Sequence, residues 1–147
     1  MIRRIGETPL PGIRYERRIG VYAILPRDGD LLVTYQAEPD NELQLPGGGV
    51  DPGEPHQRAL YREVLEETGW TIAMPRRLGA FRRFVYMPEY DKWADKICII
   101  YVAHPVRRLG PPLEEGHTDL WVAPDVAAET LGNPGDRYFV RNYLTRL

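Results

Sequence analysis

The segment from Gly48 to Trp70 constrains this chain more than any other part of its sequence. It opens with a glycine-rich turn, continues to a lone acidic residue at Glu54, and then reads as a helix that stops at Gly69. Proline suits the first position of a helix, and glycine readily adopts the left-handed conformation that ends one. With Pro55 at the start, the spacing predicts a helix over residues 55–68.

The predicted helix has two faces of different chemistry. At about 100° per residue, three glutamates share one face, and the next face is an ordinary buried stripe. Like charges crowded on one face repel, and a hard cation such as Mg²⁺ would offset that cost, because it binds carboxylate oxygens and substrate phosphates together. The glutamates are Glu63, Glu66 and Glu67, and the stripe is Leu60, Tyr61, Val64, Leu65 and Thr68.

At this spacing the segment resembles the signature of the Nudix hydrolase family, G-x5-E-x7-R-E-U-x-E-E-x-G-U, in which U is a bulky apolar residue. At ordinary residue frequencies, a match of this length is not expected by chance. Trp70, at the last U position, is bulkier than the usual aliphatic residue, which bears on packing rather than on chemistry. The fixed positions are filled by Gly48, Glu54, Arg62, Glu63, Glu66, Glu67 and Gly69, and the other U position by Val64.

The resemblance implies an α/β fold, an α/β/α sandwich in which helices flank a mixed, curved β-sheet. It also implies that Glu63, Glu66 and Glu67 bind Mg²⁺ or Mn²⁺, with Glu54 as a supporting carboxylate. We expect Arg62 to orient Glu54 or Glu63, because a guanidinium among carboxylates most simply pairs with them. The general base is left open between Glu67 and Glu63.

Glu115 is a further candidate for the metal centre. Many relatives place an extra acidic ligand or base in the loop before the last strand, and here Glu114 and Glu115 precede the strand-like Leu120–Val122. Glu115 is preferred because it stands six residues before Trp121. The alternative is a solvated acidic loop. His117, in the same loop, is either a structural histidine or a base that titrates near neutral pH.

Two sets of residues are candidates for binding the substrate. Glycine allows backbone N–H groups to approach a phosphate closely, although an ordinary loop is the alternative for the triplet Gly47, Gly48 and Gly49. Aromatic rings at the end of a predicted strand can stack on a base, although packing is the alternative role. These rings are Tyr86, Tyr90 and Trp93.

The rest of the chain reads as strands and short helices without a regular rhythm. Two β-rich runs around a turn, residues 20–25 and 31–35, predict a hairpin. The run Ile97–Val102 is nearly all apolar, which predicts a central strand buried on both faces. Residues 1–17 read as an irregular lead-in, and residues 1–147 are expected to form a single Nudix hydrolase domain. Further strands are expected at 43–45, 77–87 and 120–122, a loop at 88–94, and helices at 124–131 and 136–147.

Composition narrows the partners and the location. A net charge of −2 and a pI near 5.9 leave no basic surface for duplex nucleic acid. Cys98 is the only cysteine, which excludes an internal disulfide and fits the cytoplasm. No apolar run reaches the ~18 residues of a membrane span, and residues 1–12 lack the apolar run of a signal peptide. A small-molecule nucleotide is the expected partner, and a homodimer is left open.

The expected activity is divalent-metal-dependent hydrolysis of a pyrophosphate bond in a nucleoside diphosphate linked to another group. The L-P-G-G-G of residues 45–49 is similar to the branch of the family that hydrolyses nucleoside triphosphates, oxidised ones included. ADP-ribose and dinucleoside polyphosphates are alternative substrates. From another class, a Nudix-fold nucleotide sensor would commonly lack signature glutamates, whereas all of them are present here.

Overall fold

The computed structural model describes residues 2–146. None of the helices in these residues is long and apolar enough to cross a membrane. In chain order the elements are β1 (Arg3–Arg4), β2 (Glu16–Ile24), β3 (Pro26–Arg27), β4 (Asp30–Gln36), β5 (Glu42–Gln44), β6 (Gly47–Gly49), α1 (His56–Thr68), β7 (Trp70–Met87), the 3₁₀ turn η1 (Pro88–Tyr90), β8 (Lys92–Arg108), β9 (His117–Val122), α2 (Pro124–Thr130) and α3 (Pro134–Thr145).

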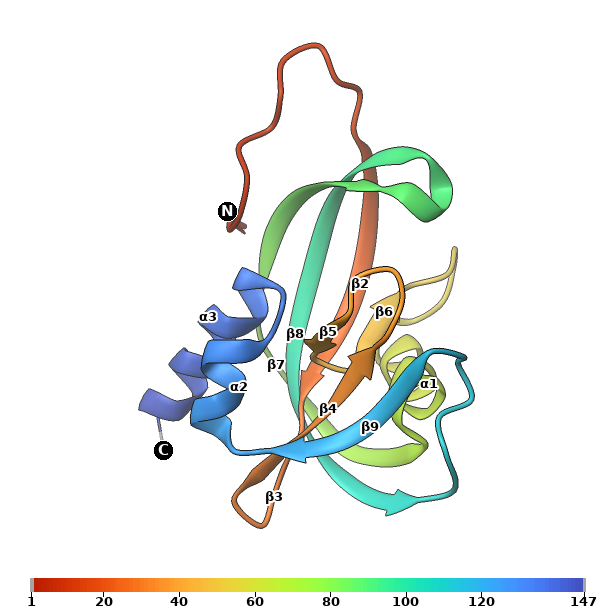
Figure 1. The fold of residues 1–147 in the computed structure, drawn as a ribbon, viewed down its shortest axis with the longest axis vertical. Helices are drawn as coiled ribbons and strands as arrows, with labels where there is room; N and C mark the ends of the chain where they lie inside the picture. The colour runs from red at the N-terminus through yellow and green to blue at the C-terminus, as the bar shows by residue number, and fades with distance from the viewer. Residues whose placement is uncertain (1, 147) are drawn as a thin grey trace.

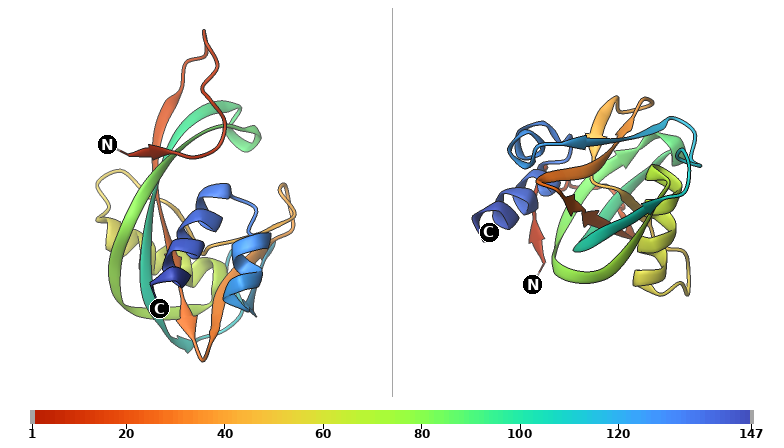
Figure 2. Two further views of the ribbon diagram at one scale, coloured as in Figure 1. Left: turned by 90° about the vertical axis from the view of Figure 1, so that its left-hand side faces the viewer. Right: turned by 90° about the horizontal axis from the view of Figure 1, so that it is seen from below.

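The strands form two sheets rather than one. The larger sheet has the order β1-β7-β8-β2-β6, and its β8 pairs parallel to β2 and antiparallel to β7. The smaller sheet is built around β4, which pairs antiparallel with β3, β5 and β9. Helix α1 lies on one side of the strands, and α2 and α3 lie on the other (Figure 1 and Figure 2). The predicted mixed α/β sandwich is confirmed, with its strands divided between two sheets.

Strand β8 is the centre of the core. Its alternate residues enter two apolar clusters, one shared with α1 and one shared with α2 and α3. Ile97, Ile99 and Tyr101 belong to the first cluster, and Cys98 and Ile100 belong to the second. Because successive side chains of a strand point to opposite faces, both faces of β8 are buried, as its apolar run predicted.

The hairpin predicted from residues 20–25 and 31–35 is wrong except at its tip. β2 and β4 lie in different sheets, and only Pro26–Arg27 folds back on Asp30 and Leu31. Strand β2 instead pairs with β8 along all nine residues of Glu16–Ile24. The other edge of β2 pairs with β6 at Gly20–Tyr22, so neither edge of this part of β2 is left for β4.

Helix α1 begins and ends within a residue of the predicted 55–68. Gly69 ends it in the left-handed conformation, with φ of 78°, and the N–H of Gly69 donates to the carbonyl oxygen of Leu65. The glycine of the signature therefore has a local structural task, which is to stop the helix and release the chain into β7.

The buried face of α1 is rotated from the predicted stripe. Tyr61, which was expected in the stripe, is exposed, whereas Ala59 and Glu67 are buried. The reason is that α1 packs against β6 and β9 as well as β2 and β7. The covered arc therefore extends to the glutamate side of the helix.

β7 and β8 form one long antiparallel hairpin, closed by η1. The pairing runs from Trp70 and Arg108 to Met87 and Lys92. Both strands are longer than predicted, because β7 begins at Trp70, directly after α1, and β8 continues past its apolar run at both ends. The loop predicted over residues 88–94 is reduced to this short turn.

The N-terminal segment is less irregular than the predicted lead-in over residues 1–17. Arg3–Arg4 pair in parallel with β7 as strand β1, and β2 already begins at Glu16. Tyr15 packs edge-on against Phe84 of β7, with ring centroids 4.9 Å apart. This contact holds the segment beside the end of the β7–β8 hairpin at the top of Figure 1.

Candidate active site

Arg62 connects the carboxylates on the glutamate face of α1. Its Nε and Nη2 donate to the two carboxylate oxygens of Glu54, at 2.8 and 2.9 Å. Its Nη1 donates to Glu63 at 2.9 Å and to Glu66 at 3.3 Å. This pairing follows the expectation from the sequence, and the planar guanidinium makes all of these contacts at once.

Glu54 and Glu63, although joined by the same arginine, have opposite electrostatic environments. The Arg62 side chain, aided by the N–H of Asp51, lowers the pKa of Glu54 to about 2. Burial, reinforced by the negative charge of Glu66, raises the pKa of Glu63 to about 7. Glu54 therefore keeps its charge and holds Arg62, whereas Glu63 takes up a proton near neutral pH even beside Arg62, and a further cation would favour its charged form.

The glycine turn packs directly onto the helix glutamates. Glu67 is 7% exposed, and its Oε1 accepts a hydrogen bond from the N–H of Gly47 at 3.1 Å. Burial nonetheless raises the pKa of Glu67 well above its usual range. Gly48 lies so close to Glu63 that a Cβ at this position would overlap the carboxylate. A larger residue at this position would therefore displace the Glu63 carboxylate.

Glu114 joins the helix glutamates from the loop between β8 and β9. Its N–H donates to the carbonyl oxygen of Glu66 at 2.9 Å. The carboxylates outnumber the one positive charge of Arg62 among them, and such an oxygen-rich set fits a divalent cation. Two groups have ligand atoms that all lie within 4.8 Å of one another: Glu63, Glu66 and Glu114, and Glu67, Glu114 and His117.

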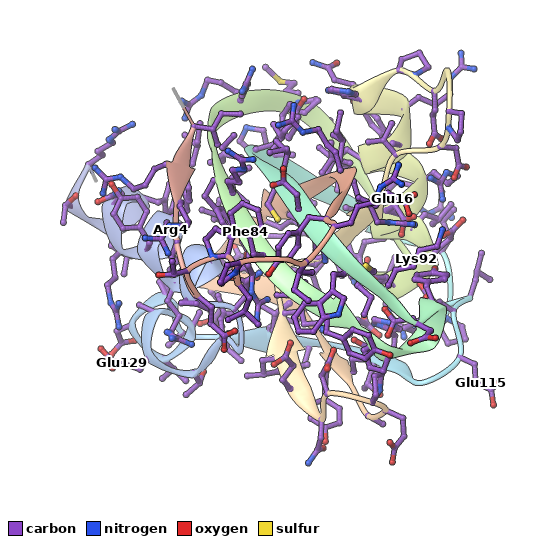
Figure 3. All side chains as sticks on the ribbon, turned by 90° about the horizontal axis from the view of Figure 1, so that it is seen from above. Arg4, Glu16, Phe84, Lys92, Glu115 and Glu129 are labelled. Carbon is purple, nitrogen blue, oxygen red and sulfur yellow. The ribbon has the colours of Figure 1, made fainter. Side chains whose placement is uncertain are left out.

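The structure does not bring Glu115 to this cluster. Its side chain is exposed, and Figure 3 shows it at the edge of the molecule, directed outward. The N–H of Glu114 is tied to the end of α1, which turns this residue toward the helix and its neighbour away from it. The place that the sequence assigned to Glu115 is occupied by Glu114.

His117 opens β9, and its side chain is only 2% exposed. Its Nε2 lies 3.6 Å from Oε2 of Glu67 and 3.9 Å from Oε1 of Glu114. Burial lowers the pKa of His117, against the opposing effect of the Glu114 carboxylate. The sequence left His117 as either a structural histidine or a base, and the structure places its ring beside the carboxylates of the candidate site.

A continuous groove opens beside these carboxylates. One part is a cleft of about 650 Å³, and the other is a cleft of about 420 Å³ that also reaches the glycines of β6. Clefts of this size hold small ligands such as nucleotides. Residues that line both parts are Tyr22, Gly49, Glu63, Met87, Tyr90 and Lys96.

Among the three aromatic candidates, Tyr90 alone lines the groove. The guanidinium of Arg18 lies over its ring, 4.8 Å from the centroid. Trp93 instead packs against Tyr15 and Tyr86, with centroid distances of 6.0 and 5.2 Å. The structure therefore separates Tyr90 from the other two aromatic residues.

Basic residues that line the groove were not among the predicted site residues. Arg18 and Lys96 both line the larger cleft, and they are register partners on the parallel strands β2 and β8. Asp136 was also missed; it lines the smaller cleft and accepts a hydrogen bond from the N–H of Leu45 at 3.4 Å. No local pattern marks these residues, because their proximity depends on strand pairing between distant segments.

Comparison with known proteins places this site in a family. The family model described as NUDIX domain matches residues 14–143. A putative 8-oxo-dGTP diphosphatase of Bacillus subtilis is 33% identical over 70 residues, which cover 48% of this chain and 47% of the relative. An 8-oxo-(d)GTP phosphatase of Mycolicibacterium smegmatis is 32% identical over 109 residues, which cover 72% of this chain and 31% of the relative. An RNA pyrophosphohydrolase of Erythrobacter litoralis is 32% identical over 88 residues, which cover 58% of this chain and 51% of the relative.

The chain spans about half or less of the length of these curated relatives. Solved structures share its fold over most of its length. A NUDIX hydrolase from Nitrosomonas europaea superposes with a TM-score of 0.72 at 20% identity, covering 88% of this chain and 90% of the other. A MutT NUDIX hydrolase from Burkholderia pseudomallei gives a TM-score of 0.66 at 25% identity, covering 86% of this chain and 97% of the other.

Proposed function

The chain belongs to the NUDIX domain family, and on this premise we propose that it is a divalent-metal-dependent pyrophosphohydrolase of a nucleoside diphosphate linked to another group. The proposed substrates are nucleoside triphosphates, oxidised ones included. The observation that carries the proposal is the convergence of glutamates from α1 and the β8–β9 loop beside a nucleotide-sized groove. The names of two curated relatives, a putative 8-oxo-dGTP diphosphatase and an 8-oxo-(d)GTP phosphatase, support this substrate class.

The carboxylates are assigned to the metal centre. Glu63, Glu66, Glu67 and Glu114 would hold Mg²⁺ or Mn²⁺, and Glu114 takes the role that the sequence suggested for Glu115. A bound divalent ion supplies charge neutralisation at the phosphate oxygens and acidifies a water molecule. Arg62 keeps Glu63 and Glu66 in place, because its guanidinium is anchored on a permanently charged Glu54.

The groove is assigned to the nucleotide. Arg18 and Lys96 place positive charge along β2 and β8, where it can offset the charge of phosphate groups. Tyr90 offers an exposed ring on which a base can stack. The backbone of Gly48 and Gly49 borders the same groove, which suits the phosphate-binding role suggested by the sequence.

The relatives named RNA pyrophosphohydrolase favour a second candidate, removal of pyrophosphate from a triphosphorylated RNA 5′ end. Such an end carries the same phosphoanhydride chemistry as a free nucleotide. A short RNA therefore belongs in the substrate panel beside ADP-ribose and dinucleoside polyphosphates.

The experiment is a product assay with the purified chain. Each nucleotide is incubated with Mg²⁺ or Mn²⁺, and the nucleoside product and the released phosphate or pyrophosphate are separated by chromatography. We expect turnover of a nucleoside triphosphate that a chelator abolishes and added Mg²⁺ or Mn²⁺ restores. Full turnover in metal-free buffer would exclude the mechanism, and binding without turnover of any substrate would identify a nucleotide sensor.

Substitution of the helix glutamates tests the same site. Glu66→Gln and Glu67→Gln should each lower kcat by several orders of magnitude, because each removes a ligand charge while keeping the shape of α1. Without metal, thermal stability should be unchanged or higher, since like-charge repulsion is relieved. The matched control is Glu129→Gln on the outer surface of α2, labelled in Figure 3. Near wild-type kcat in both helix variants would move the site elsewhere.

We further propose that the chain acts as one Nudix hydrolase domain in the cytoplasm, a compartment consistent with the free, buried thiol of Cys98. Light scattering on the same preparation decides between a monomer and a homodimer.

A further inference from the structure

His117, Thr34 and Glu67 meet at one point although they come from β9, β4 and α1. The Thr34 hydroxyl, which is fully buried, donates to the backbone carbonyl oxygen of Glu67 at 3.2 Å. A hydroxyl has a single proton, so this bond leaves only acceptor capacity on Oγ1. Nδ1 of His117 lies 3.0 Å from the same oxygen and must therefore be the donor.

The other ring nitrogen is consequently free to bind a cation. With the proton on Nδ1, Nε2 of the neutral ring carries a lone pair. It faces Oε2 of Glu67 at 3.6 Å and Oε1 of Glu114 at 3.9 Å, both beyond hydrogen-bond distance. The His117 and Glu67 side chains are buried, whereas the Glu114 side chain is 47% exposed. Three electron-pair donors that converge in this way repel one another unless a positive charge lies between them.

The separations suit a single metal ion. Two ligands bound at about 2.1 Å to one ion lie roughly 3.0–4.2 Å apart, depending on the angle between them. Both distances from Nε2 fall in this interval. Glu67 is further held by the N–H of Gly47 on its other oxygen, so the set is already oriented.

We propose that His117 is a nitrogen ligand of a second metal subsite, which shares Glu67 and Glu114 with the proposed Mg²⁺ or Mn²⁺ centre and prefers Zn²⁺ to Mg²⁺. The neighbouring group of Glu63, Glu66 and Glu114 offers oxygen ligands only. Imidazole suits Zn²⁺, whereas Mg²⁺ takes oxygen ligands and water, so the two groups differ in the ion that they favour. A role of this subsite in catalysis rests on the proposed function, but metal binding to the subsite can be measured without turnover.

Thr34 is a positioning residue in this subsite. Its hydroxyl selects the ring tautomer and orients the imidazole, and the loss of such a partner typically weakens metal binding by ~10–100-fold. Thr34→Val removes the hydroxyl at nearly constant volume, whereas Thr34→Ser retains it.

The test begins with calorimetric titration of the chelator-treated protein with Zn²⁺ alone and with Mg²⁺ alone. His117→Gln should weaken Zn²⁺ binding by at least ~10-fold and leave Mg²⁺ binding within about twofold. Thr34→Val should also weaken Zn²⁺ binding, and Thr34→Ser should not. His104→Gln, at an exposed position of β8, is the matched control. Unchanged Zn²⁺ affinity in His117→Gln, or an equal loss for both ions, overturns the proposal.

A second measurement uses the wild-type protein and does not depend on the folding of any variant. With ¹⁵N-labelled histidine, the Nε2 resonance of His117 should shift on addition of Zn²⁺, while those of His56 and His104 stay in place. An unmoved His117 resonance overturns the metal subsite alone. Absence of hydrolysis with every nucleotide would overturn the proposed function and leave the metal subsite standing.

Discussion

At the scale of single residues, the carboxylates of the site differ because their surroundings differ. Glu54 pairs with both ends of one guanidinium edge, which holds its pKa near 2, whereas burial raises the pKa of Glu63 to about 7. One is therefore an anion at neutral pH, and the other is an acid whose charged form a bound cation would favour. Arg62 links the two, which explains why a lysine with a single donor point would be a poor replacement.

Asp136 provides a prediction about pH. Burial raises the pKa of this carboxyl from 3.8 to about 7. Because the folded state then binds the proton more tightly than the unfolded state, the stabilising contribution is complete below about pH 3.8 and is lost as the pH rises through about 7. Asp136→Asn stays uncharged, so its free energy of unfolding should exceed that of the wild type at pH 8, and this advantage should shrink as the pH falls to 5.

Ionisation of Asp136 should change the free energy of unfolding by an amount on the order of 1–4 kcal/mol. Thermal unfolding between pH 5 and 8, with a chelator present, measures it. Asp125→Asn, at an exposed position of α2, is the control and should follow the wild-type curve. Parallel pH curves for Asp136→Asn and the wild type would contradict the prediction.

At the scale of elements, the loop between β8 and β9 decides which acidic residue lies beside the helix glutamates. The N–H of Glu114 is bonded to the end of α1, whereas Glu115 points outward. Glu114→Gln should therefore lower kcat by ~10-fold or more, in the range of general acid–base or ligand contributions. Glu115→Gln should leave kcat within about twofold. Steady-state kinetics on the two variants separate the structural assignment from the one made on sequence spacing, which predicts the reverse order.

The end of the β7–β8 hairpin carries aromatic residues with different tasks. Tyr90 borders the groove, so Tyr90→Ala should raise KM for a purine nucleotide by roughly 5–100-fold, the loss of ~1–3 kcal/mol of base stacking. Trp93→Ala should leave KM unchanged and lower Tm, because this ring packs on Tyr15 and Tyr86. Kinetics and thermal unfolding of the same two proteins provide the measurement. A rise in KM for Trp93→Ala but not for Tyr90→Ala would contradict the prediction and place the base beside Trp93.

At the scale of the whole molecule, metal binding should stabilise the fold, since the ligands come from α1, the β8–β9 loop and β9. An ion at about 100 times its dissociation constant contributes about 2.7 kcal/mol, which corresponds to a rise in Tm of about 5–10 °C for a chain of this size. Thermal unfolding with a chelator and then with Mg²⁺ or Mn²⁺ measures the shift. Glu67→Gln should show a smaller shift than Glu129→Gln, and an equal shift in both would place the ion elsewhere.

The sequence by itself determined the features that depend on neighbours along the chain. The family signature, the bounds of α1 and its stop at Gly69, the shared face of the helix glutamates, and the burial of β8 on both faces all follow from local spacing. The physical reason is that helices and strands repeat at known intervals, so spacing within one element decides which side chains share a face.

Only the tertiary structure decided which faces meet. It separated β2 from β4, exposed Tyr61, chose Glu114 over Glu115, and brought Thr34 and His117 to Glu67. Each outcome depends on contacts between segments far apart in the chain, where the register of a strand or the direction of one loop residue is set by the packing of the whole. Local periodicity carries no information about that choice, because it is made by the hydrogen bonds and apolar contacts that become available only when the elements assemble.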